Sequence, residues 1–288
     1  MKKLIAIDLD GTLLNSYGEI SEEDKKAVQK QIQNGAEVVL TSGRTISAME
    51  SFAEEVGANN YLISGNGTVV YDLQNKQNIY EKYLSKEKVL EIIKICEENS
   101  MYYNVYTDRS IITKNLNFNT LFYYSENLKK PAEKRTNIEQ IANIPEYIAS
   151  LEESFLKITV CDNDKAIFNR MIYALKQIED IDVLEVAHMS RKIVRIDDEE
   201  RKIEYYYTEI TSKNVNKWDA ILYLAKKIQI PVENIITIGD NVNDMKMLEN
   251  AAFGIAMENS SPKVKEIANF ITADNNNSGV GKALEIIG

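Results

Sequence analysis

Both ends of the chain alternate short apolar segments with helical segments, and this alternation limits the possible folds more than any other feature. Residues 4–7 form an apolar run of strand length that ends at Asp8, and residues 37–40 form a second run. Between them, Ser21 precedes acidic residues as at a helix N-terminus, and Gly35 follows as a stop. A strand, a helix and a strand in this order predict parallel strands joined by a right-handed crossover.

The alternation continues in the C-terminal part of the chain. A third apolar strand is predicted at 61–64. Further helices are predicted at 218–225, 244–250 and 262–268, and further strands at 235–238, 253–256 and 270–272. Short, mostly apolar runs of this kind are typical of strands that are buried on both faces of a parallel sheet. The two ends of the chain therefore predict one α/β domain.

The middle of the chain has a different pattern, with longer, more aromatic and more alternating strands. Several of them follow one another without a helix between them, which indicates antiparallel hairpins and an α+β domain. Its strands are predicted at 102–107, 155–161, 181–187, 193–196 and 202–210, and its helices at 86–99 and 164–178. We predict a core domain at 1–84 and 211–288, interrupted after its third strand by an inserted domain at 85–210.

Charge and hydropathy exclude several classes of function. The chain has 34 basic and 44 acidic residues, which gives a formal net charge of −10. This balance argues against a nucleic-acid partner, which needs a concentrated basic face, but it is compatible with a local site for a small anion. No run approaches the ~18 apolar residues of a membrane span, so we expect no membrane partner. The apolar run after Lys3 is too short for a signal peptide, and we expect a cytoplasmic protein.

Histidine and cysteine are too scarce to carry the chemistry. The chain has one histidine, His188, which excludes a metal site built from several histidines. The two cysteines, Cys96 and Cys161, lack the C-x-x-C spacing of a thiolate metal site. Catalysis is therefore expected to depend on carboxylates, lysines and hydroxyls.

A pair of carboxylates, Asp8 and Asp10, follows the first strand. Ligands bind at the carboxyl ends of strands in open α/β sheets, and an extended strand would point both side chains the same way. Gly11 permits a tight turn beside them. Clustered carboxylates repel one another and are tolerated when a cation such as Mg²⁺ lies among them. Taken alone, an Asp-x-Asp pair is more often a capped turn.

A second polar cluster, Asp240, Asn243 and Asp244, also follows an apolar strand and begins a helix. Alone, these residues could cap the helix N-terminus. Together with Asp8 and Asp10 they suit a hard divalent cation with oxygen ligands. Mg²⁺ is favoured because it typically binds one or two carboxylates, waters and a substrate phosphate.

Two further features indicate an anion site. Thr41, Ser42, Gly43 and Arg44 follow the second strand, where a hydroxyl, backbone N–H groups and a helix start make an anion-binding corner or an ordinary N-cap. Arg44 can reach a substrate or pair with a carboxylate. Lys217 lies at a predicted helix start, where its charge opposes the helix dipole and an anionic ligand would explain it.

These motifs occur in the order of the four motifs of the haloacid dehalogenase-like superfamily, and the chain resembles its Cof-type phosphatases. The matching segments begin at Asp8, Ser42, Lys217 and Asp240, with supporting similarity at 38–44, 66–67, 254–259, 268–272 and 279–280. The resemblance implies a Rossmann-like parallel-sheet core with an inserted α+β cap of the C2B type. The inserted domain resembles that of the family in its position and its α+β pattern, but it has no motif in common with the family.

The resemblance also implies a mechanism. Asp8 is expected to attack phosphorus and form an aspartyl-phosphate, while Asp10 gives a proton to the leaving oxygen and later takes one from water. Ser42 and Lys217 are expected to hold the phosphoryl oxygens. The family usually has threonine at Ser42, so Thr41 is the reserve candidate. It usually has glycine at Trp218, where the indole either packs against the sheet or narrows the site.

The resemblance assigns a metal site and further phosphate contacts. Mg²⁺ is expected at Asp8, the backbone carbonyl of Asp10, and Asp240, with Asn243 and Asp244 supporting it. Whether Asp240 or Asp244 touches the metal is left open by the spacing. Phosphate-binding residues are expected among the residues of the second, third and fourth motifs, namely Ser42, Gly43, Arg44, Lys217 and Asn243.

We therefore predict a Mg²⁺-dependent phosphatase that hydrolyses small phosphorylated metabolites, with sugar phosphates as the first candidates and phosphorylated cofactors or nucleotides behind them. The inserted domain would act as a cap. The alternatives are a phosphomutase of the same superfamily and a non-catalytic protein that binds a phosphorylated metabolite.

Overall fold

The structure is a computed structural model that describes residues 2–184, 189–196 and 199–288. His188 and the end of the strand predicted at 181–187 lie outside the described residues. The described residues divide into two compact units. Lys82–Val215 forms the inserted unit, and the residues before and after it form the core unit. Within the described part of the chain, every helix is too short or too polar to cross a bilayer.

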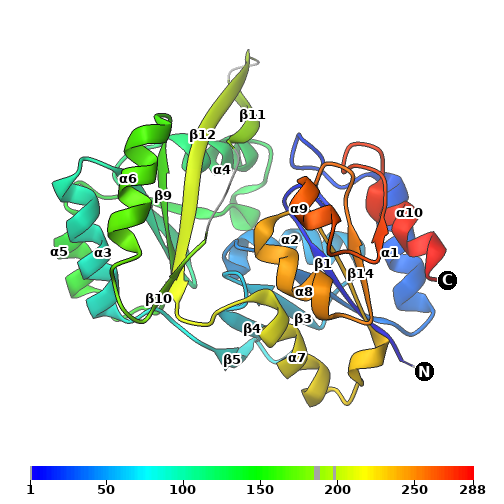
Figure 1. Cartoon of the computed structure of the whole chain (residues 1–288). Helices are drawn as coiled ribbons and strands as arrows, with labels where there is room; N and C mark the ends of the chain where they lie inside the picture. Colours follow the sequence, from blue (N-terminus) through cyan, green and yellow to red (C-terminus); the bar gives the residue numbers. More distant parts are fainter. Residues whose placement is uncertain (1, 185–188, 197–198) are drawn as a thin grey trace. The chain divides into compact units, whose positions relative to one another are not determined.

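The core unit is an α/β structure (Figure 1). Its strands are β1 (Leu4–Asp8), β2 (Glu37–Thr41), β3 (Tyr61–Ser64), β4 (Val69–Asp72), β5 (Gln77–Glu81), β13 (Ile235–Gly239), β14 (Phe253–Ala256) and β15 (Phe270–Ile271). Its helices are α1 (Glu22–Gln33), α2 (Ile46–Val56), α7 (Lys217–Lys227), α8 (Met245–Asn250), α9 (Pro262–Lys265) and α10 (Gly279–Ile286). The strand order is β15-β14-β13-β1-β2-β3-β4-β5. The strands from β15 to β3 pair in parallel, which confirms the predicted α/β class.

Two strands depart from the predicted parallel sheet. β4 pairs antiparallel with β3, and β5 pairs antiparallel with β4. The inserted unit therefore follows β5, and its predicted position after the third strand is wrong. Val69 and Val70 in β4 are buried, but β5 is partly or fully exposed and mostly polar, so it lacks the apolar pattern that marks a strand in sequence.

Burial explains why the core strands form. Every residue of β1, β2 and β13 is buried, as expected for central strands covered on both faces. Trp218 of α7 is 8% exposed and belongs to a buried cluster with Leu4, Ala6 and Val39, so it packs against the sheet. Helix α1 packs along α10, and Ser21 caps α1 by accepting a hydrogen bond from the backbone N–H of Asp24.

The inserted unit is a mixed α+β structure. Its strands are β6 (Tyr102–Thr107), β7 (Ser110–Thr113), β8 (Asn137–Gln140), β9 (Phe155–Asp162), β10 (Ile181–Val183), β11 (Ser190–Ile196) and β12 (Glu199–Ser212). Its helices are α3 (Lys86–Glu98), α4 (Phe118–Leu128), α5 (Ile144–Ser150) and α6 (Lys165–Leu175). The strand order is β10-β12-β9-β6-β7-β8, with β11 paired to β12. All pairs are antiparallel except β7 with β8.

The boundaries of this unit differ slightly from the predicted ones at 84/85 and 210/211. Leu84 already pairs with Phe155 of β9, and β12 remains paired with β10 as far as Ser212. The chain therefore enters the inserted unit earlier, and leaves it later, than the hydrophobic pattern indicates.

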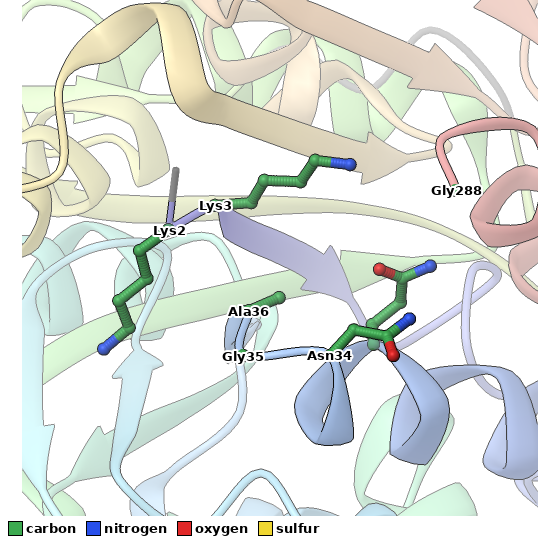
Figure 2. Close-up of a pocket in the computed structure, with 7 residues that line it drawn as sticks. Lys2, Lys3, Asn34, Gly35, Ala36 and Gly288 are labelled. Carbon is green, nitrogen blue, oxygen red and sulfur yellow. The ribbon is translucent and has the colours of Figure 1, made fainter.

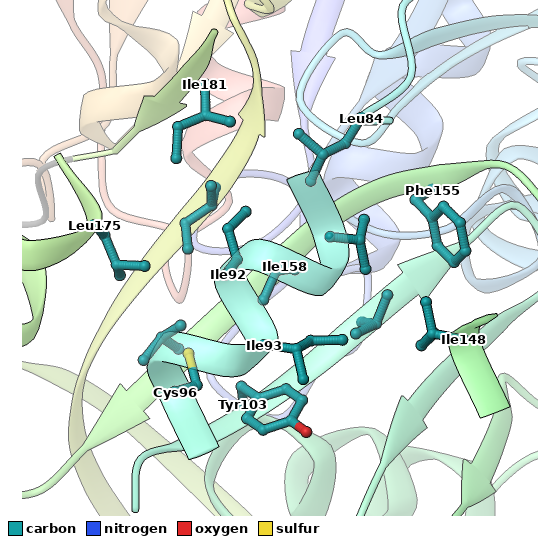
Figure 3. Close-up of a cluster of buried hydrophobic side chains, with 14 of the residues drawn as sticks. Leu84, Ile92, Ile93, Cys96, Tyr103, Ile148, Phe155, Ile158, Leu175 and Ile181 are labelled. Atoms are coloured by element: carbon teal, nitrogen blue, oxygen red, sulfur yellow. The ribbon is translucent and has the colours of Figure 1, made fainter. Parts of the chain in front are cut away.

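One face of the inserted sheet carries an apolar core (Figure 3). Ile92, Ile93 and Cys96 of α3 lie in one buried cluster with Ile158 of β9 and Leu175 of α6. Burial raises the pKa of Cys96 to about 12, so this thiol behaves as an apolar core group.

This cluster generates a stability prediction. Replacing Ile158, which is fully buried, with Ala should lower the free energy of unfolding by about 2–5 kcal/mol because it leaves a cavity. Ile167→Ala, at a 51% exposed position on α6, is the matched control and should cost far less. Urea denaturation measures both, and equal losses would contradict the assignment of Ile158 to the core.

Candidate active site

The predicted site residues converge at one edge of the core sheet. Asp8 is the last residue of β1, Ser42 follows β2, and Asp240 follows β13. These strands are neighbours in the order β13-β1-β2-β3, and they run parallel, so their carboxyl ends meet. This edge is where open α/β sheets bind ligands.

A buried lysine holds the centre of the site. The Nζ of Lys217 donates to Asp8 Oδ1 at 2.5 Å and to Asp244 Oδ1 at 2.6 Å. All three side chains are buried. Lys217 is the first residue of α7, whose preceding residue Asn216 caps the helix by accepting from the N–H of Asp219. The two ion pairs explain why a lysine occupies a helix start despite the unfavourable dipole.

The charges in this site are strongly coupled. Burial raises the pKa of Asp8 to about 7 against the lowering effect of Lys217, and the charges of Asp244 and Asp10 raise it further. Burial, together with the charges of Asp8 and Asp244, raises the pKa of Asp240 well above its ordinary value. Burial alone would lower the pKa of Lys217, but the carboxylates of Asp244 and Asp8 raise it overall. Three carboxylates, those of Asp8, Asp240 and Asp244, lie around one lysine, so the cluster is negative when all three are ionised.

The cluster of acidic side chains fits a divalent cation. Ligand oxygens of Asp8, Asp240 and Asp244 lie within 4.8 Å of one another. Oxygen ligands, crowding and an excess of negative charge are the conditions under which a hard cation such as Mg²⁺ is bound.

The loop after β13 is held by Asp244. Its Oδ2 accepts from the backbone N–H groups of Asp240 and Asn241, each at 3.0 Å, while its Oδ1 accepts from Lys217. Both oxygens of Asp244 thus have protein donors. Asp244 anchors Lys217 to the loop that carries Asp240.

Asp240 has neighbours that the sequence analysis did not assign to the site. Thr12 Oγ1 donates to Asp240 Oδ1 at 3.1 Å, and Asn259 Nδ2 lies 3.4 Å from Oδ2 and 2.8 Å from the carbonyl oxygen of Gly11. Gly11 has φ +86°, and a Cβ there would lie 2.5 Å from Asp240 Oδ2. Thr12 and Asn259 belong to the segments that carry the family resemblance, but neither is charged and neither stands at the end of an apolar strand.

Ser42 joins the loops after β2 and β3. Its carbonyl oxygen accepts from the backbone N–H of Asn66 at 2.9 Å, and the Oδ1 of Asn66 accepts from Asn243 Nδ2 at 3.0 Å. Gly67 has φ +98°, and a Cβ there would lie 2.2 Å from the carbonyl oxygen of Asn216. This glycine lets the loop approach the start of α7, where Lys217 lies. Asn66 is a third residue, after Thr12 and Asn259, that the sequence analysis did not assign to the site.

Arg44 pairs with Asp10. Its Nε lies 2.8 Å from Asp10 Oδ2 and its Nη2 lies 2.9 Å from Oδ1. Of the two possibilities that the sequence left open for Arg44, the structure shows pairing with a carboxylate. Gly43 lies between Ser42 and Arg44 in the same loop, and its contact with phosphate stays a prediction. The role of Thr41 as the reserve candidate for Ser42 also stays a prediction.

A separate cavity lies away from this site (Figure 2). It has a volume of about 410 Å³ and is lined by residues before β1, after α1 and at the C-terminal end, including Lys2, Lys3, Asn34 and Gly288. Lys3 directly precedes β1, whereas Asp8 ends it, so the cavity lies at the amino end of that strand. Lys2 pairs with Glu37, and Lys3 donates to the carbonyl oxygen of Ile287. We do not assign this cavity to the active site.

The comparisons with known proteins agree with the geometry. Residues 5–284 match the family described as haloacid dehalogenase-like hydrolase, and the chain belongs to this family. It is 29% identical to phosphatase YwpJ of Bacillus subtilis (strain 168) over 98% of this chain and 99% of that protein. It is also 29% identical to the 5-amino-6-(5-phospho-D-ribitylamino)uracil phosphatase YcsE of the same organism, over 98% and 94%.

A comparison with solved structures also supports the membership of the haloacid dehalogenase-like hydrolase family. A haloacid dehalogenase-like hydrolase from B. subtilis has a TM-score of 0.80 to this chain at 27% identity, covering 98% of this chain and 99% of that one. The family resemblance inferred from the motifs is confirmed. The chain is a phosphoric monoester hydrolase of this family.

The ion pairs of Lys217 generate a prediction about pH. In buffer with EDTA, Lys217→Met should lower the free energy of unfolding by about 3–5 kcal/mol near pH 8, because it leaves buried carboxylates without their cation. The loss should be smaller at pH 5. The pKa of Asp8 is raised to about 7 in the folded protein, so folding favours its protonated form. The stability that this protonation contributes is present below the pKa of Asp8 in the unfolded chain and is lost as pH rises through about 7. Removing Lys217 raises the pKa of Asp8 further, so more stability is lost between pH 5 and pH 8.

Lys226→Met, at an exposed position of the same helix, is the control and should change stability little at either pH. Chemical denaturation at both pH values measures the difference. An equal loss for Lys217→Met at pH 5 and pH 8 would show that the lysine does not offset the carboxylate charges.

Proposed function

We propose that this protein hydrolyses phosphate monoesters of small metabolites in two steps through an aspartyl-phosphate on Asp8. The observation that carries the proposal is the buried ion pair between Lys217 and the carboxylate of Asp8 at the carboxyl end of β1. The family membership supports the reaction class, and the names of the relatives support a phosphorylated small molecule as substrate.

The chemistry follows from the positions of the carboxylates. An oxygen of Asp8 attacks phosphorus while the bond from phosphorus to the leaving oxygen breaks. Asp10 gives its proton to that oxygen, so the product leaves as an alcohol. Water then attacks the phosphorus of the aspartyl-phosphate, and Asp10 takes a proton from it. The bond to Asp8 breaks and inorganic phosphate leaves, which restores both carboxyl groups.

Charge and hydrogen bonds hold the phosphoryl group in this proposal. Lys217 offsets negative charge on the phosphoryl oxygens, as it does on Asp8. Ser42 Oγ accepts from the backbone N–H of Arg44 at 3.2 Å, which leaves its own proton to donate to a phosphoryl oxygen. Asn243 donates to Asn66, whose backbone N–H is bonded to Ser42, and this supports the predicted contact of Asn243 with the phosphoryl group.

Asp8, Asp240 and the backbone carbonyl of Asp10 would hold Mg²⁺. Asp240 is favoured over Asp244 as the direct ligand, because both oxygens of Asp244 accept from Lys217 or backbone N–H groups. Thr12 and Asn259 orient Asp240. The bound ion would reduce the repulsion between the Asp8 carboxylate and an anionic substrate.

Sugar phosphates and related phosphorylated metabolites are the proposed substrates. The name of the relative YcsE describes a phosphoribityl compound as its substrate, which supports this class. The inserted unit is assigned as a cap that selects the substrate, as in the family that the chain resembles. Steady release of inorganic phosphate separates this function from a phosphomutase and from a binding protein without turnover.

Replacing the nucleophile tests the first step. Asp8→Asn should reduce hydrolysis by at least about 10³-fold, because an amide cannot form the phosphoryl intermediate. Its circular dichroism spectrum should match that of the wild type. Glu249→Gln makes a similar carboxylate-to-amide change at an exposed position and should leave the rate unchanged. Near-normal turnover by Asp8→Asn would remove Asp8 as nucleophile.

Metal removal tests the cation site. EDTA should stop phosphate release and added Mg²⁺ should restore it. Mg²⁺ should also raise the melting temperature of the wild type, because a ligand that binds the folded state stabilises it. Asp240→Asn should weaken both effects. An enzyme that is indifferent to EDTA would contradict the proposed metal site.

A further inference from the structure

The charged side chain of Arg44 is buried, and burying a charge is unfavourable. Its side chain is 1% exposed, and it lies in the loop between β2 and α2, directly before Thr45, which caps α2. Burying a guanidinium is costly unless its hydrogen bonds are satisfied. A role beyond filling space is therefore expected for this side chain.

The partner of Arg44 is the carboxyl group of Asp10. The guanidinium contacts both oxygens, at 2.8 Å and 2.9 Å, so the two planar groups meet as a bidentate pair. The guanidinium carbon also lies 5.3 Å from the centre of the Phe52 ring on α2. The side chain of Asp10 is itself 31% exposed. One partner is thus buried and held, while the other can be reached from outside.

The backbone of Arg44 is held as firmly as its side chain. Its carbonyl oxygen accepts from Ser64 Oγ at 2.7 Å and from the N–H of Gly65 at 3.1 Å. Its N–H donates to Ser42 Oγ. These bonds tie Arg44 to the ends of β2 and β3, which belong to the buried sheet. The position of the guanidinium is therefore determined by the sheet.

We propose that Arg44 is a positioning residue for Asp10 and not a ligand of the phosphoryl group; this rests on the proposed function. Asp10 stands beside Gly11 on a turn and has two side-chain torsions of its own. A proton donor must lie within hydrogen-bond reach of the leaving oxygen, and small misplacements are costly in rate. The bidentate pair fixes the plane of the carboxyl group. It also stabilises the carboxylate that Asp10 becomes after donating its proton and before taking one from water.

The role of Arg44 can be read from the dependence of rate on the leaving group. p-Nitrophenolate leaves without a proton, whereas phenolate and sugar alkoxides need one. Arg44→Lys keeps the charge but can neither form the bidentate pair nor match its planar geometry. The variant is compared with the wild type on p-nitrophenyl phosphate, phenyl phosphate and ribose 5-phosphate.

We expect kcat/KM, which reports only the step in which the leaving group departs, to fall by about 10²-fold on phenyl phosphate and ribose 5-phosphate, since general acid catalysis contributes on that order. On p-nitrophenyl phosphate we expect kcat/KM to fall less than about 3-fold, with the inhibition constant of inorganic phosphate unchanged. The water step, in which Asp10 acts as base, is common to all substrates and affects kcat but not kcat/KM. Asp10→Asn should show the same dependence on leaving group, and the double variant should be no worse than Asp10→Asn alone.

Two results would overturn the proposal. An equal fall in kcat/KM on all substrates, with weaker phosphate inhibition, would make Arg44 a phosphoryl ligand. A lower melting temperature with unchanged rates would make it structural only. Arg201→Lys, at an exposed ion pair with Glu199, is the control and should change nothing. If Arg44→Lys does not fold, Phe52→Leu, which removes the ring beside the guanidinium, should show the same selective loss in weaker form.

A failure of the proposed function can be distinguished from a failure of the positioning role. If the wild type releases no phosphate, or if Asp8→Asn keeps its activity, the reaction itself is wrong. If the wild type is active and Asp8→Asn is not, but Arg44→Lys loses kcat/KM equally on every leaving group, the positioning role alone is wrong.

Discussion

The structure of the site depends on one buried ammonium group between two carboxylates. Lys217 joins Asp8 from β1 to Asp244 from the segment after β13, although these residues are far apart in the chain. The desolvation of these charges is tolerable because each carboxylate has a donor within hydrogen-bond distance. When ionised, the three carboxylates of the cluster exceed the single charge of Lys217, and this excess is the physical reason for assigning a cation to the site. In the proposed function, metal binding, phosphate binding and nucleophilic attack would all depend on this balance of charge.

The sheet makes this balance possible by bringing loops together. β13, β1, β2 and β3 are adjacent and parallel, so the polar residues that follow them share one edge. The loops are then bonded to one another through Asp244, Asn66 and Arg44. Glycines at positions 11 and 67 allow the close approaches between these loops. The reacting groups are thereby carried by a rigid scaffold, as general acid catalysis and phosphoryl transfer require.

The sequence predicts the parts of the fold that depend on local pattern. The apolar runs of β1, β2, β3, β13 and β14 are recognisable because these strands are buried on both faces. The convergence of Asp8 with Asp240 follows from the rule that parallel strands end at the same edge. The hairpin strand β5 is missed because three of its five residues are polar, although Ile79 and Tyr80 pack against the core cluster.

Contacts between distant side chains are harder to predict. The partner of Arg44, the bond of Lys217 to Asp244 and the bonds of Thr12 and Asn259 to Asp240 depend on how loops fold against one another. No periodicity encodes them. Asn66 was within reach of prediction, because it follows a strand that ends at the same edge as Asp8. The chemical roles of the assembled residues stay predictions.

The stereochemical course at phosphorus tests the central claim, that Asp8 carries the phosphoryl group between substrate and water. A phosphorothioate monoester made chiral with oxygen isotopes would be hydrolysed in isotopically labelled water, and the configuration of the released thiophosphate determined. Two in-line displacements, first by Asp8 and then by water, predict net retention of configuration. Net inversion would show a single direct attack by water and would contradict the account.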